Sequence, residues 1–217
     1  MDEDTTQAAA VAAGKVGDGV GKVAELGSNA LATGRAFGGW LKDTFGTIPE
    51  DVLGVAGGDW LHHQRRRNLM ALEANTEAER RRRNAGPANE PSASVVMPLL
   101  LGAADEGRPE LQALWASLLA SAMEPDGGRR VRRAFFETLR AMEPDDALVF
   151  RAVMEASNGG TIGIISFTDL VRHCGLNQTQ HDVTRDALLR LSLIQLHGSV
   201  YGVSSYGNEF WRACRPA

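Results

Sequence analysis

This sequence has little of what marks several protein classes. It holds two cysteines in 217 residues, Cys174 and Cys214, so it carries no disulfide framework. A pairing of these two stays open, although a reducing cytosol is the simpler setting. The strongly apolar stretch from Pro91 to Ala104 spans 14 residues, below the roughly 18 that indicate a membrane span. The acidic start, MDEDTTQ, argues against a secretory signal. We therefore expect a cytoplasmic protein.

The chain also lacks the net positive charge that is typical of nucleic-acid-binding proteins. Its 23 Lys and Arg against 27 Asp and Glu give a net charge of −4. The charge is unevenly spread: residues 1–58 hold 4 basic and 8 acidic groups, residues 59–143 hold 13 and 12, and residues 144–217 hold 6 and 7. Nucleic acid is thus an open partner class but not the favoured one.

Recognisable motifs for catalysis or cofactor binding are missing too. The segment GDGVGKV at Gly17–Val23 resembles a phosphate-binding loop, but its first glycine is one residue too close and Val23 stands where Ser or Thr holds magnesium. Neither the CxxC nor the HxxxH spacing of zinc sites occurs, nor do the GxSxG and HExxH hydrolase motifs. We predict no catalytic, cofactor-binding or metal-binding residues and no enzymatic activity, although a site of dispersed residues would leave no such motif.

What the chain does have is helical periodicity, most clearly from Pro109 to Pro125. The preceding segment, Ser92 to Ala104, is almost wholly apolar, and Pro98 inside it should kink a helix or confine it to one side of the proline. We expect these two helices to form the core of a helical domain. On the second helix, apolar residues recur at steps of three and four: Leu111, Leu114, Trp115, Leu118, Leu119 and Met123.

Further helices are predicted on either side of this pair. One runs from Pro49 to about Asn84, and its apolar stripe fades after Leu72 into the charged stretch NTEAERRRRN, which we expect to be solvated. Another runs from Arg129 to Met142 with its arginines outward. The stripe of the first helix consists of Val52, Ala56, Trp60 and His63, and the inward residues of the second are Val131, Phe135, Leu139 and Met142.

The C-terminal part mixes helices with short strands. Helices are predicted at Asp145–Ala156, from Asn177 to about Leu193, and around Phe210 and Trp211. Strands are predicted at Thr161–Ile165, Ile194–His197 and Val200–Val203, and a capping box at Ser166–Asp169 begins a short helix to His173. This order is that of a winged helix-turn-helix. The predicted fold is mainly α: a helical bundle followed by a C-terminal winged-helix-like α+β module.

Three domains follow from these elements. Residues 1–46 form a Gly/Ala-rich N-terminal helical segment, residues 47–143 a helical domain and residues 144–217 a winged-helix-like domain. Two glycine pairs in the first segment, Gly17 with Gly21 and Gly34 with Gly38, have the spacing that lets helices approach closely. A helix that packs on a neighbour is the favoured interpretation, while membrane contact through residues 8–45 and disorder stay open.

The candidate contact residues for nucleic acid or a protein partner are arginines and polar side chains on two predicted helices. For the arginine clusters, a solvated face paired with Glu73, Glu77 and Glu79 is favoured over phosphate binding. On the later helix, Asp182 and Asp186 offset the arginines, which favours a protein contact over DNA reading. The candidates are Arg65, Arg66, Arg67, Arg80, Arg81, Arg82, Arg83, Gln178, Gln180, His181 and Arg185.

Several stretches together resemble the bacterial abortive-infection alpha family. They are GDWLHHQRRRN, VVMPLLLGAADE, ELQALWASLLASAMEP, FFETLRAMEPDDALVF and the tail YGVSSYGNEFWRAC. The resemblance covers roughly residues 50–217 and consists of packing patterns, so it carries over no catalytic residues. It implies a bacterial anti-phage role in which an infected cell stops growing or dies, and an effector that is held quiet until infection.

These observations predict a non-enzymatic abortive-infection protein that acts as a membrane-acting or partner-controlled effector. The alternative is a winged-helix DNA-binding regulator. A protein partner or a homo-oligomer is the favoured partner, no cofactor is expected, and membrane association on activation stays open beside the cytoplasmic location.

Overall fold

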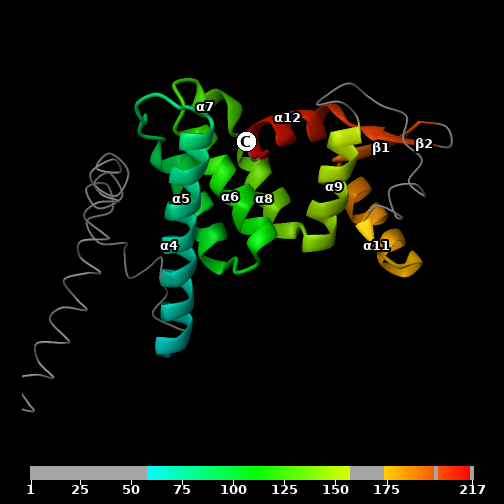
Figure 1. Cartoon of the computed structure of the whole chain (residues 1–217), viewed down its shortest axis with the longest axis horizontal. Helices are drawn as coiled ribbons and strands as arrows, with labels where there is room; N and C mark the ends of the chain where they lie inside the picture. The colour runs from blue at the N-terminus through cyan, green and yellow to red at the C-terminus, as the bar shows by residue number, and fades with distance from the viewer. Residues whose placement is uncertain (1–57, 157–173, 198–199, 216–217) are drawn as a thin grey trace, which may run out of the picture. The chain divides into compact units, whose positions relative to one another are not determined.

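The computed structural model describes residues 58–156, 174–197 and 200–215. In these ranges the protein is mainly helical, with a small antiparallel sheet near the C-terminus (Figure 1). The predicted mainly α fold is therefore confirmed, and Pro49–Ala217 forms one compact unit. The three predicted domain ranges stay predictions. The predictions of structure for residues 1–57 and for Thr161–His173 concern residues outside the described ranges, and so does the predicted membrane contact through residues 8–45.

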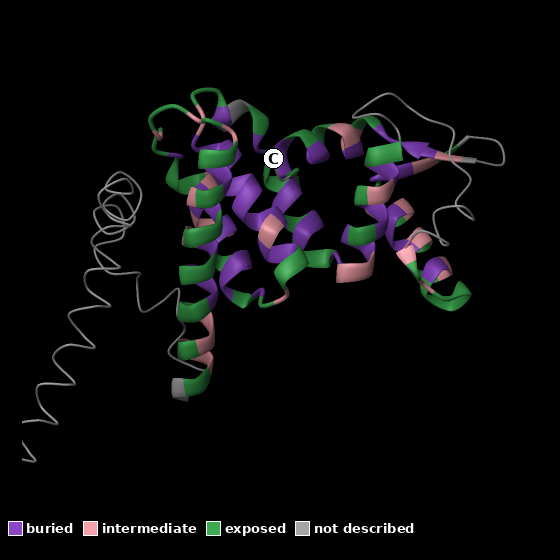
Figure 2. Cartoon of the chain, viewed as in Figure 1, coloured by how far each residue is buried: buried purple, intermediate pink, exposed green. Residues whose placement is uncertain are grey.

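Helix α6 (Pro109–Ala122) is the core of the unit, as the sequence predicts. It begins with proline at its first position and ends before Met123. From Leu111 to Ala122 every residue except Ala113 is buried (Figure 2). The expectation of one apolar face was too narrow, because a helix enclosed on all sides is buried all round. Its neighbours are α4 (Gly58–Arg82), α5 (Ala93–Asp105), α7 (Gly127–Arg130), α8 (Arg133–Ala141), α9 (Pro144–Ala156) and α12 (Ser205–Cys214).

Helix α5 continues through Pro98, so of the two predicted effects of this proline, a kink or confinement to one side, confinement is excluded. Pro98 leaves the carbonyl of Ser94 without its intrahelical donor, but Ser94 is exposed and water can take that role. Gly102 lets α5 lie close to α6, since a Cβ there would lie 2.5 Å from Cη2 of Trp115. The tryptophan itself is fully buried.

Helix α4 reverses the burial that the sequence predicts. Trp60, a member of the expected apolar stripe, is 75% exposed. The stretch after Leu72, which the sequence predicts to be solvated, is partly buried, since Thr76 is 0% and Glu79 is 2% exposed. It continues the buried face of Leu69 and Leu72 in a helix that packs on α5 and α6. The expectation failed because residues 68–83 meet α6, and that contact depends on the tertiary fold rather than on local hydropathy.

The turn between α5 and α6 is held by a carboxylate–guanidinium pair. Arg108 donates its backbone N–H and its Nε–H to Oε1 of Glu106 at 2.8 and 2.9 Å, and Nη2 donates to Oε2 at 2.9 Å. Burial opposes ionisation of Glu106, but the hydrogen bonds from Arg108 outweigh it and lower the pKa of this carboxyl. Nε2 of Gln112 donates to the Ala103 carbonyl at 3.0 Å and closes the turn.

The predicted helix from Arg129 to Met142 is two helices. Helix α7 ends at Arg130, Val131 and Arg132 are extended, and α8 begins at Arg133. Like charges three and four residues apart destabilise a helix, and the four arginines at 129, 130, 132 and 133 have these spacings. The inward residues are correct, since Val131, Phe135, Leu139 and Met142 are all buried.

The C-terminal elements follow the predicted order where they are described. Helix α11 (Gln178–Arg190) begins at the predicted Asn177, which forms a capping box with Gln180, although the helix ends three residues before Leu193. Strands β1 (Ile194–His197) and β2 (Val200–Val203) pair antiparallel, with Ile194 opposite Val203. Helix α12 returns to the core, where Oγ of Ser121 donates to the Ala213 carbonyl at 2.7 Å.

Aromatic rings join α12 to the helices before it. The ring centroid of Phe210 lies 5.6 Å from that of Phe135 and 5.9 Å from that of Phe150. Cys174 and Cys214 are both free thiols, and burial raises the pKa of Cys214 well above its ordinary value. Over the described part of the chain, no helix combines the length and the apolar character that crossing a membrane requires.

Candidate functional site at the end of helix α4

Arg83 links three parts of the fold just beyond the end of α4. Its Nε donates to Oε1 of Glu79 at 2.8 Å, and its Nη1 donates to Oγ of Ser121 at 2.8 Å and lies 3.2 Å from Oε1 of Glu124. Nη2 reaches the backbone carbonyl of Arg215 at 3.0 Å. Five hydrogen bonds of the guanidinium group thus fix the end of α4 against α6 and the C-terminal segment.

Arg80 lies one helical turn earlier and is 9% exposed. Its Nη2 donates to the Gly86 carbonyl at 2.7 Å, whereas its Nη1 is buried and has no hydrogen-bond partner. No carboxylate in the described ranges forms an ion pair with it. Arg80 is therefore a buried cation whose hydrogen-bonding capacity is only partly used.

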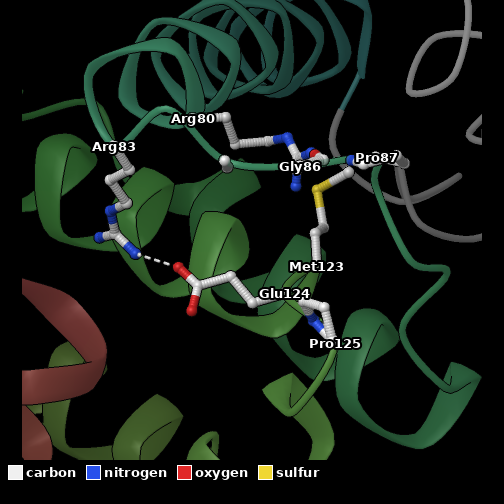
Figure 3. Close-up of a pocket in the computed structure, with 8 residues that line it drawn as sticks. Arg80, Arg83, Gly86, Pro87, Met123, Glu124 and Pro125 are labelled. Carbon is white, nitrogen blue, oxygen red and sulfur yellow. Dashed lines mark hydrogen bonds and ion pairs between the residues drawn. The ribbon is translucent and has the colours of Figure 1, made fainter.

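A pocket of about 300 Å³ opens beside these two arginines (Figure 3). Arg80 and Arg83 come from the end of α4, and Glu124 comes from the segment after α6. Glu124 accepts from Arg83 and, through Oε2, from Arg130 at 2.9 Å, so it is not available as a free general base. The pocket is lined by Arg80, Arg83, Ala85, Gly86, Pro87, Met123, Glu124 and Pro125.

The other arginines of α4 lie outside this pocket. Arg65 pairs with Asp105 at 2.6 Å, Arg66 is exposed, and Arg67 donates to Gln64 at 2.6 Å. The exposed Arg81 and Arg82 pair with Glu77 and Glu79, at 3.1 and 3.2 Å. Of the predicted pairings with Glu73, Glu77 and Glu79, those with Glu77 and Glu79 are therefore present. For Arg80 and Arg83 the expected solvated face is wrong, because α6 and residues 85–87 cover them.

The candidate residues on α11 are engaged with their own helix or its neighbours. Arg185 binds Asp182 and Asp186, each at 2.9 Å, and its hydrogen bond to Asp186 raises its pKa. Gln180 belongs to the capping box, and its Nε2 lies 3.4 Å from Oδ2 of Asp145. Nε2 of Gln178 lies 3.3 Å from Oδ1 of Asp182, and His181 is buried. The structure does not bring these residues together with the α4 arginines into one site.

The described ranges were compared with the side-chain arrangements of metal sites and of cysteine nucleophiles. No cluster of three or more His, Cys, Asp or Glu side chains there has the arrangement of a metal site. Cys214 lies fully buried, and burial raises its pKa, although the positive charge of Arg83 acts in the opposite direction. A thiol whose pKa is raised by burial is a poor nucleophile.

Of the eight residues that line the pocket, sequence reasoning named only Arg80 and Arg83 as candidates. Gly86 and Pro87 belong to a helix breaker, and Met123 to Pro125 mark the end of α6, so local patterns identify them only as the ends of helices. Their proximity comes from the packing of α4 on α6. No signal in a single sequence indicates that two helix ends lie side by side.

The comparisons with known proteins agree with the packing patterns. The sequence profile described as abortive infection alpha matches residues 64–214, which include α4 from its second turn, α5 to α9, α11, the hairpin and α12. Neither a curated protein nor a solved structure matches the chain. The match spans well over half of the 217 residues, and the chain therefore belongs to the abortive infection alpha family.

Proposed function

We propose that this member of the abortive infection family is a non-enzymatic defence protein whose state is controlled by a protein contact, either with another protein or with a second copy of itself. The observation that carries the proposal is the outward face of α11. This helix occupies the place of the reading helix in a winged-helix-like module, a fold assignment that belongs to the same proposal. Its surface has the composition of a protein contact rather than of a DNA-reading face.

The charges on α11 balance. Two aspartates and two arginines lie along it, and Arg185 is held by both aspartates. A side chain held in this way is not free to contact phosphate or a base edge, and DNA-reading faces carry net positive charge. At the centre of the exposed face stands Val183, which is 65% exposed. An apolar residue there suits a protein surface better than a phosphate backbone.

The polar groups of the arginine pocket support the non-enzymatic part of the proposal. Its carboxylate, Glu124, is neutralised by two arginines. Arg80 and Arg83 bind and position, but a guanidinium group neither abstracts a proton nor attacks a substrate near neutral pH. These residues suit a binding role rather than a catalytic one, which agrees with a protein that acts through binding.

Phage plating on cells that produce the full chain tests the proposal. Val183→Glu should lower protection at least about tenfold while the melting temperature stays within a few degrees, since exposed helix positions tolerate substitution. The matched control is Arg190→Gln on the same exposed face, which should leave protection unchanged. Fluorescence anisotropy with duplex DNA should show no binding that weakens with salt.

The DNA-binding regulator is the result that would replace this proposal. It requires the opposite pattern: full protection with Val183→Glu, loss with Arg190→Gln, and DNA affinity that falls steeply as salt rises. Protection that survives both substitutions would likewise remove α11 from the mechanism.

A further inference from the structure

Helix α4 exposes two large apolar side chains on the side opposite its buried residues. Trp60 is 75% exposed and Met70 is 64% exposed, although both belong to a helix that packs on the core. Figure 2 shows that exposed positions continue along the outer side of this helix. At interfaces between proteins, aromatic residues and Met are enriched relative to the rest of the surface. The two side chains therefore make the outer side of α4 a candidate contact surface.

Two charged side chains of the same helix have no partner in the described ranges. Glu73 is half-buried, which raises the pKa of its carboxyl, and neither a hydrogen bond nor an ion pair joins it to another described residue. Arg66 is exposed and equally without a partner among the described residues. Arg66 precedes Glu73 by seven residues, which places the two on the same flank of α4, about 10.5 Å apart along its axis. Side chains pair within a helix when they are three or four residues apart, so these two cannot satisfy each other in one chain.

We propose that α4 is the contact surface between two copies of this chain, which pack antiparallel about a two-fold axis that passes next to Met70. An axis midway between Arg66 and Glu73 brings Arg66 of each copy level with Glu73 of the other, on the same flank. Because a two-fold contact is repeated, this ion pair forms twice. A parallel pair would instead place equal charges side by side, which costs free energy. The order of the charges along α4 therefore favours a second, reversed copy of the same helix.

The same axis brings partners to the exposed apolar residues. Met70 lies next to the axis, so it packs against Met70 of the second copy at the centre of the contact. Trp60 lies six residues before Arg66, and it comes level with the position six residues beyond Glu73 of the second copy. Ala78 is exposed close to that level, and its small side chain leaves room for the indole ring. One arrangement thus covers Trp60 and Met70 and also pairs Glu73.

The length of this surface limits the strength of the contact. The stretch from Trp60 to Ala78 is about 27 Å long, at a rise of about 1.5 Å per residue. One helix from each chain over that length is a small interface, and small interfaces are typical of transient complexes. We therefore expect a dimer that forms reversibly and depends on protein concentration. This inference does not rest on the proposed protein contact at α11, since it uses other residues and is tested on the purified chain without phage.

Sedimentation velocity of the purified full chain tests the proposal. As the protein concentration rises to about 100 μM, the native chain should approach the mass of two copies, because a small interface lies at the weak, micromolar end of protein affinities. Arg66→Glu and Glu73→Arg each place like charges level at both ion pairs, so each should weaken association at least tenfold. The matched controls are Arg140→Glu and Glu137→Arg at exposed positions of α8. They make the same changes of charge, and their association should stay within twofold of the native chain.

An equimolar mixture of Arg66→Glu and Glu73→Arg is the most specific step. In a mixed pair, position 66 of each chain lies beside an opposite charge at position 73 of the other, so association should recover to within threefold of the native chain. A parallel pair predicts a different result, since its native contacts are already repulsive and the mixture would bind more tightly than the native chain. Circular dichroism checks that each variant is folded. If Glu73→Arg does not fold, Glu73→Gln keeps the shape of the side chain without its charge and should weaken association at least threefold.

Four results would overturn the proposal. The first is a native chain that stays single over the whole concentration range, which would leave the outer side of α4 to a different partner. The second is unchanged association in both α4 variants, and the third is an equal loss in the α8 controls. The fourth is a mixture of folded variants that does not recover. Self-association that Val183→Glu abolishes and the α4 variants leave intact would assign the contact to α11, so failure here is distinguishable from failure of the proposed function.

Discussion

The two arginine clusters of α4 have similar composition, but only the second contains arginines that join separate parts of the core. Near the start of the helix, Arg65 has a side chain that is 22% exposed and pairs with Asp105, which is 52% exposed, and Arg66 and Arg67 are exposed. Beyond the other end, Arg83 has a side chain that is 16% exposed, and it binds α6 and the C-terminal segment. Arg80 is buried beside the pocket.

The difference shows that the role of a charge cluster depends on what covers it. Exposed ion pairs contribute between zero and about 1 kcal/mol, since water and salt screen them. Breaking a buried pair costs about 3–5 kcal/mol, because the remaining charge is left without compensation. We therefore expect Arg83 to contribute more to stability than the arginines near the start of α4.

The largest expected effect is that of Arg83→Met. It should lower the free energy of unfolding by about 3 kcal/mol, since it removes one of the two arginine partners of the buried Glu79 and five hydrogen bonds. Denaturant unfolding in phosphate-free buffer measures it. The matched control, Arg67→Met, should stay within about 0.5 kcal/mol. Equal losses of stability in the two variants would show that Arg83 contributes no more than the exposed Arg67.

Glu79→Gln tests the same network from the carboxylate side. Glu79 is 2% exposed and binds both Arg82 and Arg83. The variant should lose about 2 kcal/mol, because a neutral amide compensates two cations less well. A double-mutant cycle with Arg83→Met should give a coupling free energy of about 1 kcal/mol or more. Strict additivity would mean that Glu79 and Arg83 do not act together.

Glu106→Gln examines a buried carboxylate whose arginine partner, Arg108, is 41% exposed. The expected loss at pH 7 is about 1–2 kcal/mol. Because the pKa of Glu106 is lowered from 4.5, the folded state binds fewer protons there than the unfolded state. The stability that the ionised form contributes is present above pH 4.5 and is lost as pH falls through the lower, folded pKa.

The measurement for Glu106 is unfolding of both chains between neutral pH and pH 3. The native chain and the Glu106→Gln variant should converge as the pH falls through that window. A difference in the free energy of unfolding that stays constant over the whole pH range would show that the contact between Arg108 and residue 106 does not need the negative charge of Glu106.

Asp105→Asn should have the smallest effect. It breaks the ion pair with Arg65. Because the carboxylate of Asp105 is half exposed, the loss should stay below about 1 kcal/mol. Raising the salt concentration should shrink this difference further, because exposed charges are screened. Thermal unfolding at two salt concentrations measures it. A loss as large as that of Arg83→Met would place Arg65 among the buried arginines.

Local signals predicted much of the fold. The proline at the start of α6, the capping box of Asn177 and Gln180, and the two strands of the hairpin lie where the sequence indicates. The core position of α6 follows from its apolar residues. Each of these features depends on residues within one or two helical turns, and such residues are neighbours in the sequence as well.

The burial of Arg80 and the pocket beside it could not be predicted in this way. The charged end of α4 looks like a solvated helix until α6 and residues 85–87 cover it. Trp60 shows the converse, an apolar residue that the described fold leaves exposed. The break at Val131 and Arg132 was also missed, since the pattern places Val131 and Phe135 inward whether the helix is continuous or split.

The most direct test of this account is hydrogen exchange of the guanidinium groups, measured by NMR on the full chain with isotope-labelled arginine. Single Arg→Lys substitutions assign the signals. The account predicts that the Nε–H of Arg83 is protected from exchange, whereas the Nε–H groups of the exposed Arg66 and Arg67 exchange rapidly. Arginine signals that all exchange alike would contradict it, because the two ends of α4 would then be equivalent.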